Sequence, residues 1–240
     1  ESADIILLSR DLDVLRQGVE DGRRTFANTL KYISITTSAN FGNMISMALA
    51  TPLLPFLPLA AKQILLNNFL SDLPSIAISS DNVDADRVSS PQRWNVHEIR
   101  RFMLVFGLIS SVFDLLTFAV LRYVFHAQQA VFQTSWFMIS LLTELAVVIV
   151  LRTRKPVLRS RPSRLLVWST IGVVTATFAI PYIGAGSALF GFVPLSSMDL
   201  LGVVAIVLGY IAATEITKSY FFRHEATRPS DPVLDRGRLG

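Results

Sequence analysis

Apolar residues dominate six stretches of the chain, each near the length of about 20 residues that an α-helix needs to cross a bilayer. These stretches are residues 32–54, 59–79, 102–124, 132–151, 165–183 and 198–217. A more polar helix over 11–33 runs into the first stretch, and a short apolar strand is expected at 4–8. The pattern predicts an all-α membrane protein of six transmembrane helices, preceded by a short strand and a stalk helix.

Lysine and arginine occur in alternate connections between these spans. They precede the first span, follow the sixth, and occupy the second and fourth connections, whereas residues 51–58, 127–133 and 184–197 contain none. By the positive-inside rule, both ends of the chain and the basic connections lie in the cytoplasm. Topology therefore explains the net charge of +4, and we expect no nucleic-acid partner.

Composition agrees with this class of protein, since 51% of the residues are hydrophobic and only 17% are charged. The sequence contains no cysteine, which excludes disulfides and thiolate metal ligands. The expected strand at 4–8 has no partner strand in the sequence. We therefore expect the sequence to be a fragment of a longer protein.

Polar side chains form a stripe on each of the first two spans. Asn40 and Asn43 recur at helical spacing in the first, as do Asn68 and Asp72 in the second. The short connection 51–58 makes the two spans antiparallel neighbours. A carboxylate at bilayer depth is by default part of an ion or proton pathway, and oxygen ligands suit a hard cation. The alternative is that the amides and hydroxyls only join the helices by hydrogen bonds.

Pro74 follows Asp72 by two residues and has no N–H to continue the helix. A helix broken beside an intramembrane acid frees carbonyl oxygens, as in the cation sites of many transporters. The sequence therefore predicts a broken helix and a cation site at Asp72.

Three further acids lie in or near the spans. Asp114 is either a second ion ligand or a helix-packing acid bonded by nearby serines, and we favour packing. Glu144 either lines the ion path or is a protonated acid that faces the bundle, and the sequence does not separate the two. Glu215 is three residues from Lys218, which predicts an ion pair at the cytoplasmic edge.

Basic residues gather in the connection between the fourth and fifth spans: Arg152, Arg154, Lys155, Arg159, Arg161 and Arg164. Clustered cations beside a span attract anionic lipid. We favour a role in topology alone, with membrane lipids, including anionic ones, as the alternative partner.

Several strings resemble the P-type ATPases. Residues 1–8 resemble the end of their phosphorylation domain, and 18–32 resemble the stalk that enters their fifth transmembrane helix. The cation-site parts of helices five and six are similar to Ser38-Ala39-Asn40-Phe41-Gly42-Asn43 and Asn68-Phe69-Leu70-Ser71-Asp72. The bacterial magnesium-transporting members are similar at Ser80-Asp81-Asn82-Val83-Asp84, Pro91-Gln92-Arg93-Trp94 and Ile109-Ser110-Ser111-Val112-Phe113-Asp114.

The resemblance implies a division of the chain into three parts. Residues 1–31 would be the end of the phosphorylation domain and the stalk, 32–217 transmembrane helices five to ten, and 218–240 a cytoplasmic tail without fixed structure. It further implies that part of the ion site consists of Asn40, Asn43, Asn68 and Asp72, with Asp114 and Glu144 as additional candidates for the ion path. Calcium pumps carry glutamate at the position of Asn43, so the amide argues against calcium.

The implied function is the membrane part of an ATP-driven Mg²⁺ importer in the plasma (inner) membrane. The sequence lacks the family's phosphorylation and nucleotide-binding motifs, so we expect no ATP hydrolysis by this chain alone. Its partners would be the upstream catalytic domains and the first four transmembrane helices. One alternative is a stand-alone, non-enzymatic membrane protein, either a remnant or a regulatory partner of a full-length pump. Another is a secondary transporter or channel, which the strand at 4–8 and the stalk argue against.

Overall fold

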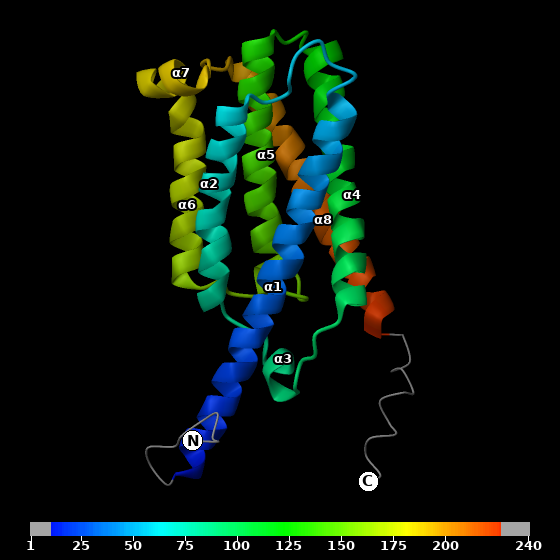
Figure 1. Ribbon diagram of the computed structural model, residues 1–240, viewed down its shortest axis with the longest axis vertical. Coiled ribbons are helices and arrows are strands. Elements are labelled where there is room, and N and C mark those ends of the chain that lie inside the picture. The colour runs from blue at the N-terminus through cyan, green and yellow to red at the C-terminus, as the bar shows by residue number, and fades with distance from the viewer. Residues whose placement is uncertain (1–10, 227–240) are drawn as a thin grey trace.

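The computed structural model describes residues 11–226 as a bundle of long helices (Figure 1). The long helices are α1 (Leu12–Ala50), α2 (Ala61–Ala77), α4 (Val96–Ala119), α5 (Gln129–Leu151), α6 (Arg164–Ala179) and α8 (Ser197–Ala226). The shorter elements are α3 (Ala85–Ser89), α7 (Gly184–Phe190) and the turns η1 (Ile78–Ser80), η2 (Val120–Val124), η3 (Val157–Arg159) and η4 (Ile180–Tyr182). No strand occurs within 11–226, and the strand expected at 4–8 lies outside the described residues.

Four helical segments are long and apolar enough to cross a membrane: Val96–Val124, Gln129–Leu151, Arg164–Tyr182 and Ser197–Arg223. They correspond to the last four predicted spans. The predicted count of six is not confirmed, because α1 and α2 do not meet the same criterion. Amides and hydroxyls lower the hydropathy of α1, and Asn67, Asn68 and Asp72 lower that of α2. The two helices that fall short are those that carry the predicted ion ligands.

The helix α5 lies at the centre of the bundle. Helices α2 and α6 pack against it, and α8 covers another side (Figure 1). The side chains of Phe137, Met138 and Leu141 on α5 are fully buried. A helix that is apolar all round is stable only when neighbours enclose it. The composition of α5 therefore determines its central position.

Helix α1 packs along α4, and glycines bring the two backbones close together (Figure 1). A Cβ added to Gly42 would lie 2.9 Å from the Cβ of Ser110, and one added to Gly107 would lie 2.7 Å from the ring of Phe41. Small residues allow this close approach of membrane helices. The contact fixes the part of α1 that carries Asn40 and Asn43.

The predicted helix break at Pro74 is wrong, because α2 continues through this residue to Ala77 and is followed by the turn η1. Proline removes only one backbone hydrogen bond, the one that would reach the carbonyl of Leu70. The Ser75 hydroxyl donates to the carbonyl of Ser71 at 2.9 Å, and α2 packs on α5 and α6. These interactions hold the helix together despite the lost bond.

Helix α8 extends to Ala226, so the first residues of the predicted tail 218–240 are helical. Lys218 is buried, and its ammonium donates to the carbonyls of Val150 at 3.0 Å and Lys155 at 2.9 Å. Phe221 is also buried. These contacts extend the helix beyond the apolar span, and the rest of the tail lies outside the described residues.

Candidate functional site

A cavity of about 470 Å³ lies between α1, α2 and α5. Three of the four predicted ion ligands line it, namely Asn40 and Asn43 from α1 and Asn68 from α2. The rest of its wall consists of Met44, Met47, Leu59, Ile64, Asn67, Trp136 and Ser140. The structure therefore gathers the amides of two antiparallel helices around one space with largely apolar walls.

Asp72 lies next to this cavity without lining it. Its place on α2 is four residues beyond Asn68, or about 6 Å along the helix axis. Its side chain is exposed in the described structure, and so is that of Asn68. The same carboxylate lies near enough to Glu144 on α5 for the two charges to interact.

The four predicted ligands share one property: within residues 11–226, their side chains make no hydrogen bond and no ion pair. An amide or carboxylate without a partner is unfavourable by several kcal/mol in an apolar environment. Each oxygen of Asn40, Asn43, Asn68 and Asp72 is thus available to a ligand. A carboxylate and amide oxygens are a donor set for a hard cation.

Glu144 approaches the cavity from α5. Its Oε2 accepts a long hydrogen bond of 3.4 Å from Nδ2 of Asn67, and the hydroxyl of Ser71 also lies beside it. Asn67 is buried, lines the cavity, and keeps its Oδ1 without a partner in the described part of the chain. Helix α2 thus presents polar groups on two faces, with Asn67 and Ser71 toward α5.

Asn67 is a site residue that the sequence reasoning did not select. Asn67 and Ser71 are four residues apart, like Asn68 and Asp72, so the sequence holds two parallel polar stripes on the same helix. Only the packing of α2 on α5 distinguishes the two stripes. The acid on α5, Glu144, was the available signal that an inward stripe exists.

Asp114 lies apart from the open cavity, in a fully satisfied environment. Its Oδ2 accepts from the Ser46 hydroxyl at 2.6 Å, and its Oδ1 accepts from Nε1 of Trp136 at 3.2 Å. The serine that bonds it is therefore on α1, whereas the neighbouring Ser111 bonds backbone carbonyls. This arrangement joins α1, α4 and α5 and fits the packing interpretation of Asp114.

Two predictions about basic residues have clear outcomes. The ion pair between Glu215 and Lys218 is confirmed, with 2.7 Å between Oε2 and Nζ. Arg152 is fully buried, and its guanidinium contacts Asp81. Arg152 is therefore unavailable to anionic lipid, whereas Arg154, Lys155 and Arg159 of the same connection are exposed.

Comparison with known proteins gives consistent results. Residues 56–220 match the family model described as "Cation transporting ATPase, C-terminus". The chain is 44% identical, over 93% of its length, to the magnesium-transporting ATPase, P-type 1, of Escherichia coli strain K12. It is 38% identical over 93% of its length to a protein of the same name from Salmonella typhimurium strain LT2. A calcium-transporting ATPase of Bacillus cereus is 28% identical over 49% of the chain.

The chain spans about a quarter of the length of the magnesium-transporting relatives, 25% of the protein from Escherichia coli. The resemblance to the bacterial magnesium-transporting P-type ATPases, drawn first from short strings, is confirmed by similarity over nearly the whole chain. The family model and the membrane-length helices agree. The chain therefore belongs to the family of cation-transporting ATPases and corresponds to their C-terminal membrane region.

Proposed function

We propose that this chain is the membrane part of an ATP-driven Mg²⁺ importer and supplies part of its intramembrane cation site. The proposal depends on one observation: four oxygen-bearing side chains have no hydrogen-bond or ion-pair partner in the described chain. Three of them, Asn40, Asn43 and Asn68, line one cavity, and Asp72 lies one helical turn away. The names of the magnesium-transporting relatives supply the identity of the ion.

The cavity has room for magnesium together with its water. Mg²⁺ sheds water reluctantly and keeps octahedral coordination, so proteins usually hold it by one or two carboxylates and several waters. Six waters at about 30 Å³ each occupy roughly 180 Å³, well within the cavity of about 470 Å³. A site that contacts a hydrated ion through amides needs fewer negative charges than a calcium site, in which the ligands bind the dehydrated ion directly.

Charge balance assigns Glu144 to the same site. Asp72 alone would leave a divalent cation with net positive charge in a medium that penalises charge. Asp72 and an ionised Glu144 would together supply two negative charges within range of each other's field. Asn67 holds Glu144 toward α2. We therefore place the ion between α1, α2 and α5, with Asp72 and Glu144 as its two carboxylates.

ATP hydrolysis belongs, in this proposal, to the part of the relatives that precedes the matched region. The partners of this chain would be the catalytic domains and the first four transmembrane helices. The intact protein would cross the plasma membrane several times with both ends in the cytoplasm. The beginning of α1 and the end of α8 lie at the same end of the bundle, which supports this topology (Figure 1).

The test is ATP hydrolysis and Mg²⁺ transport in reconstituted vesicles, by the chain alone and by the chain joined to the upstream region of a magnesium-transporting relative. Mg²⁺-stimulated hydrolysis and Mg²⁺ accumulation by the joined protein, with none by the chain alone, are expected. Inactivity of the joined protein, in vesicles where the intact relative is active, would favour a non-enzymatic remnant or regulatory partner instead. Equal stimulation by Ca²⁺ would remove magnesium from the proposal.

A further inference from the structure

A buried ion cluster, here called the Asp81 cluster, consists of Lys31, Asp81 and Arg152. Oδ2 of Asp81 lies 3.1 Å from Nζ of Lys31 and 3.3 Å from Nη1 of Arg152, and Oδ1 accepts the N–H of Ser163 at 3.1 Å. The side chains are almost completely buried, with 3% exposure for Lys31 and 0% for Asp81 and Arg152. One carboxylate thus accepts hydrogen bonds from donors on α1, at the end of α5 and at the start of α6.

The backbone that follows α2 is bound to α1 as well. Nδ2 of Asn28 donates to the carbonyls of Ser79 at 3.1 Å and Asp81 at 2.9 Å, and Nζ of Lys31 donates to the carbonyl of Asn82 at 2.9 Å. Asn28 and Lys31 are three residues apart and therefore lie on the same face of α1. Side chains of α1 thus bind both the backbone carbonyls after α2 and the side chain of Asp81.

Elsewhere the two helices that carry the predicted ligands make few direct contacts. Helix α1 packs mainly on α4, whereas α2 packs on α5 and α6. The contacts of α1 with the α2 segment concentrate after α2, at η1 and α3. The relative position of the two ligand-bearing helices therefore depends on the Asp81 cluster.

The spacing along the chain relates this cluster to the cation site. Asn40 lies nine residues after Lys31 on α1, and Asp72 lies nine residues before Asp81. Nine residues of α1 rise about 13.5 Å, whereas the nine residues from Asp72 to Asp81 include the end of α2 at Ala77 and the turn η1. A contact between Lys31 and Asp81 thus fixes the depth of the ligands on α1 relative to those on α2.

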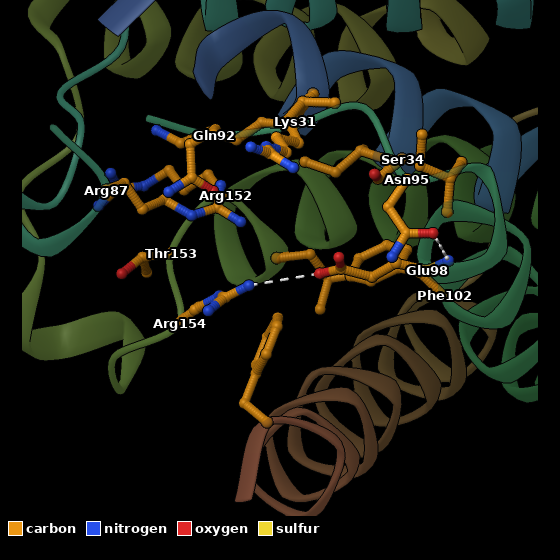
Figure 2. Close-up of a pocket in the computed structure, with 16 residues that line it drawn as sticks. Lys31, Ser34, Arg87, Gln92, Asn95, Glu98, Phe102, Arg152, Thr153 and Arg154 are labelled. Atoms are coloured by element: carbon orange, nitrogen blue, oxygen red, sulfur yellow. Dashed lines mark hydrogen bonds and ion pairs between the residues drawn. The ribbon is translucent and has the colours of Figure 1, made fainter. Parts of the chain in front are cut away.

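Positive charge converges on Asp81. Figure 2 shows Lys31 and Arg152 at a pocket of about 60 Å³ that Arg87 and Arg154 also line, where Arg154 pairs with Glu98 at 3.4 Å. Burial lowers the pKa of Lys31, and its contacts with Asp81 oppose this shift. Without the carboxylate, two buried cations would repel each other across the boundary between α1 and α5. The end of α2 would then lose its fixed position relative to α1.

We propose that Asp81 is a positioning residue of the pump, which holds α1 and α2 in register so that ligands from both helices meet one ion. The inference rests on the proposed cation site but concerns a residue outside it. Asp81 touches no transported ion in this proposal; it acts through the depth and orientation of Asn40 and Asp72. Groups that orient metal ligands typically change metal affinity by about 10- to 100-fold when they are removed.

The test uses the full-length protein in membranes and compares Asp81→Asn with the matched control Glu98→Gln. Both changes remove a carboxylate bound to an arginine at this end of the bundle, but Glu98 pairs with Arg154 of the connection after α5 and not with Lys31 of α1. We expect Asp81→Asn to raise the Mg²⁺ concentration for half-maximal ATP hydrolysis at least about tenfold. The number of ions moved per ATP should fall as well, whereas the KM for ATP stays unchanged. Glu98→Gln should leave all three quantities unchanged.

A second variant, Lys31→Met, tests the inference independently in case Asp81→Asn fails to fold. It removes the Lys31 contacts with Asp81 and Asn82, keeps the hydrogen bonds of Asn28 and leaves Asp81 neutralised by Arg152. We expect a rise in the same half-maximal concentration. Lower yield or thermal stability with unaltered Mg²⁺ dependence and transport ratio in both variants would overturn the inference, because a merely structural role predicts that outcome. Absence of Mg²⁺-stimulated hydrolysis in the unmodified protein would instead overturn the proposed function.

Discussion

Two aspartates, one on α2 and one directly after η1, have opposite surroundings. Asp72 is exposed and makes no hydrogen bond or ion pair within residues 11–226. Asp81 is buried and receives Lys31, Arg152 and a backbone N–H. A carboxylate that its own chain satisfies on every side has no remaining capacity for a metal ion, whereas one left open has. In the proposed site, the open surroundings of Asp72 thus mark a ligand acid, and the filled surroundings of Asp81 mark a positioning acid.

The sequence does not distinguish these two residues by their neighbours, since each follows a serine. Asp72 was predicted as a ligand because it interrupts an apolar stretch, where an acid is unfavourable. Asp81 lies just beyond that stretch, and its partners are 50 and 71 residues away in the sequence. A local sequence pattern indicates that an acid in a membrane is energetically unfavourable, but it does not indicate which distant residues contact that acid.

The comparison predicts its largest effect at Asp72. Asp72→Asn should lower Mg²⁺ uptake by the full-length protein roughly 100-fold or more, as expected for loss of a charged metal ligand. Insertion and folding should stay normal, because the side chain has no partner in the described chain to lose. Uptake is measured in cells that lack other magnesium transporters, with Asp199→Asn as the control, since Asp199 bonds only within its own turn. Uptake at the unmodified level would exclude Asp72 from the mechanism.

Glu144→Gln tests whether the inward acid shares the charge of the ion. The amide can still meet Asn67 but lacks the second negative charge, so we expect Mg²⁺ affinity to fall about tenfold. Half-maximal Mg²⁺ stimulation of ATP hydrolysis measures the effect. If Glu144 is only a protonated acid that faces the bundle, glutamine replaces it without change in this value.

Asn43→Glu tests selectivity at the cavity wall. An added carboxylate supplies a ligand to a larger ion that sheds its water easily, so Ca²⁺-stimulated ATP hydrolysis should rise a few-fold relative to Mg²⁺-stimulated hydrolysis. Asn43→Gln, which keeps the amide, is the matched control. An unaltered ratio would mean that the choice of ion lies in other helices of the pump.

Asp114→Asn should have the smallest effect on transport, within about twofold, because its two donors come from Ser46 and Trp136. The amide accepts through one oxygen only, so one buried donor loses its partner and stability falls by about 1–3 kcal/mol. Thermal unfolding in detergent is the measurement, with uptake as the second readout. A large loss of uptake at normal stability would identify Asp114 as a ligand.

The sequence was sufficient for the long apolar helices, because length and composition are local properties. Helical spacing also placed Asn40, Asn43 and Asn68 on the faces that line one cavity, whereas their role as ion ligands stays a prediction. The helix break at Pro74 was wrong because the packing of α2 on α5 and α6 outweighs one lost hydrogen bond. Asn67 was missed because only the position of α5 decides which stripe of α2 faces inward.

The glycine contact between α1 and α4 has a consequence for how access to the site can alternate. A rotation of α1 against α4 would bring a side chain to the place of Gly42 or Gly107, where a Cβ would lie within 3.0 Å of neighbouring atoms, so the rotation would cause a clash. The two helices are therefore a single rigid body at the depth of Asn40 and Asn43. Helix α2 packs on α5 and α6 instead, and its opposite end is held as well, because Nε2 of Gln63 donates to the carbonyl of Phe190 at 2.9 Å. A change of access to the site would therefore move α2 together with α5 and α6 against this rigid body, rather than α2 alone.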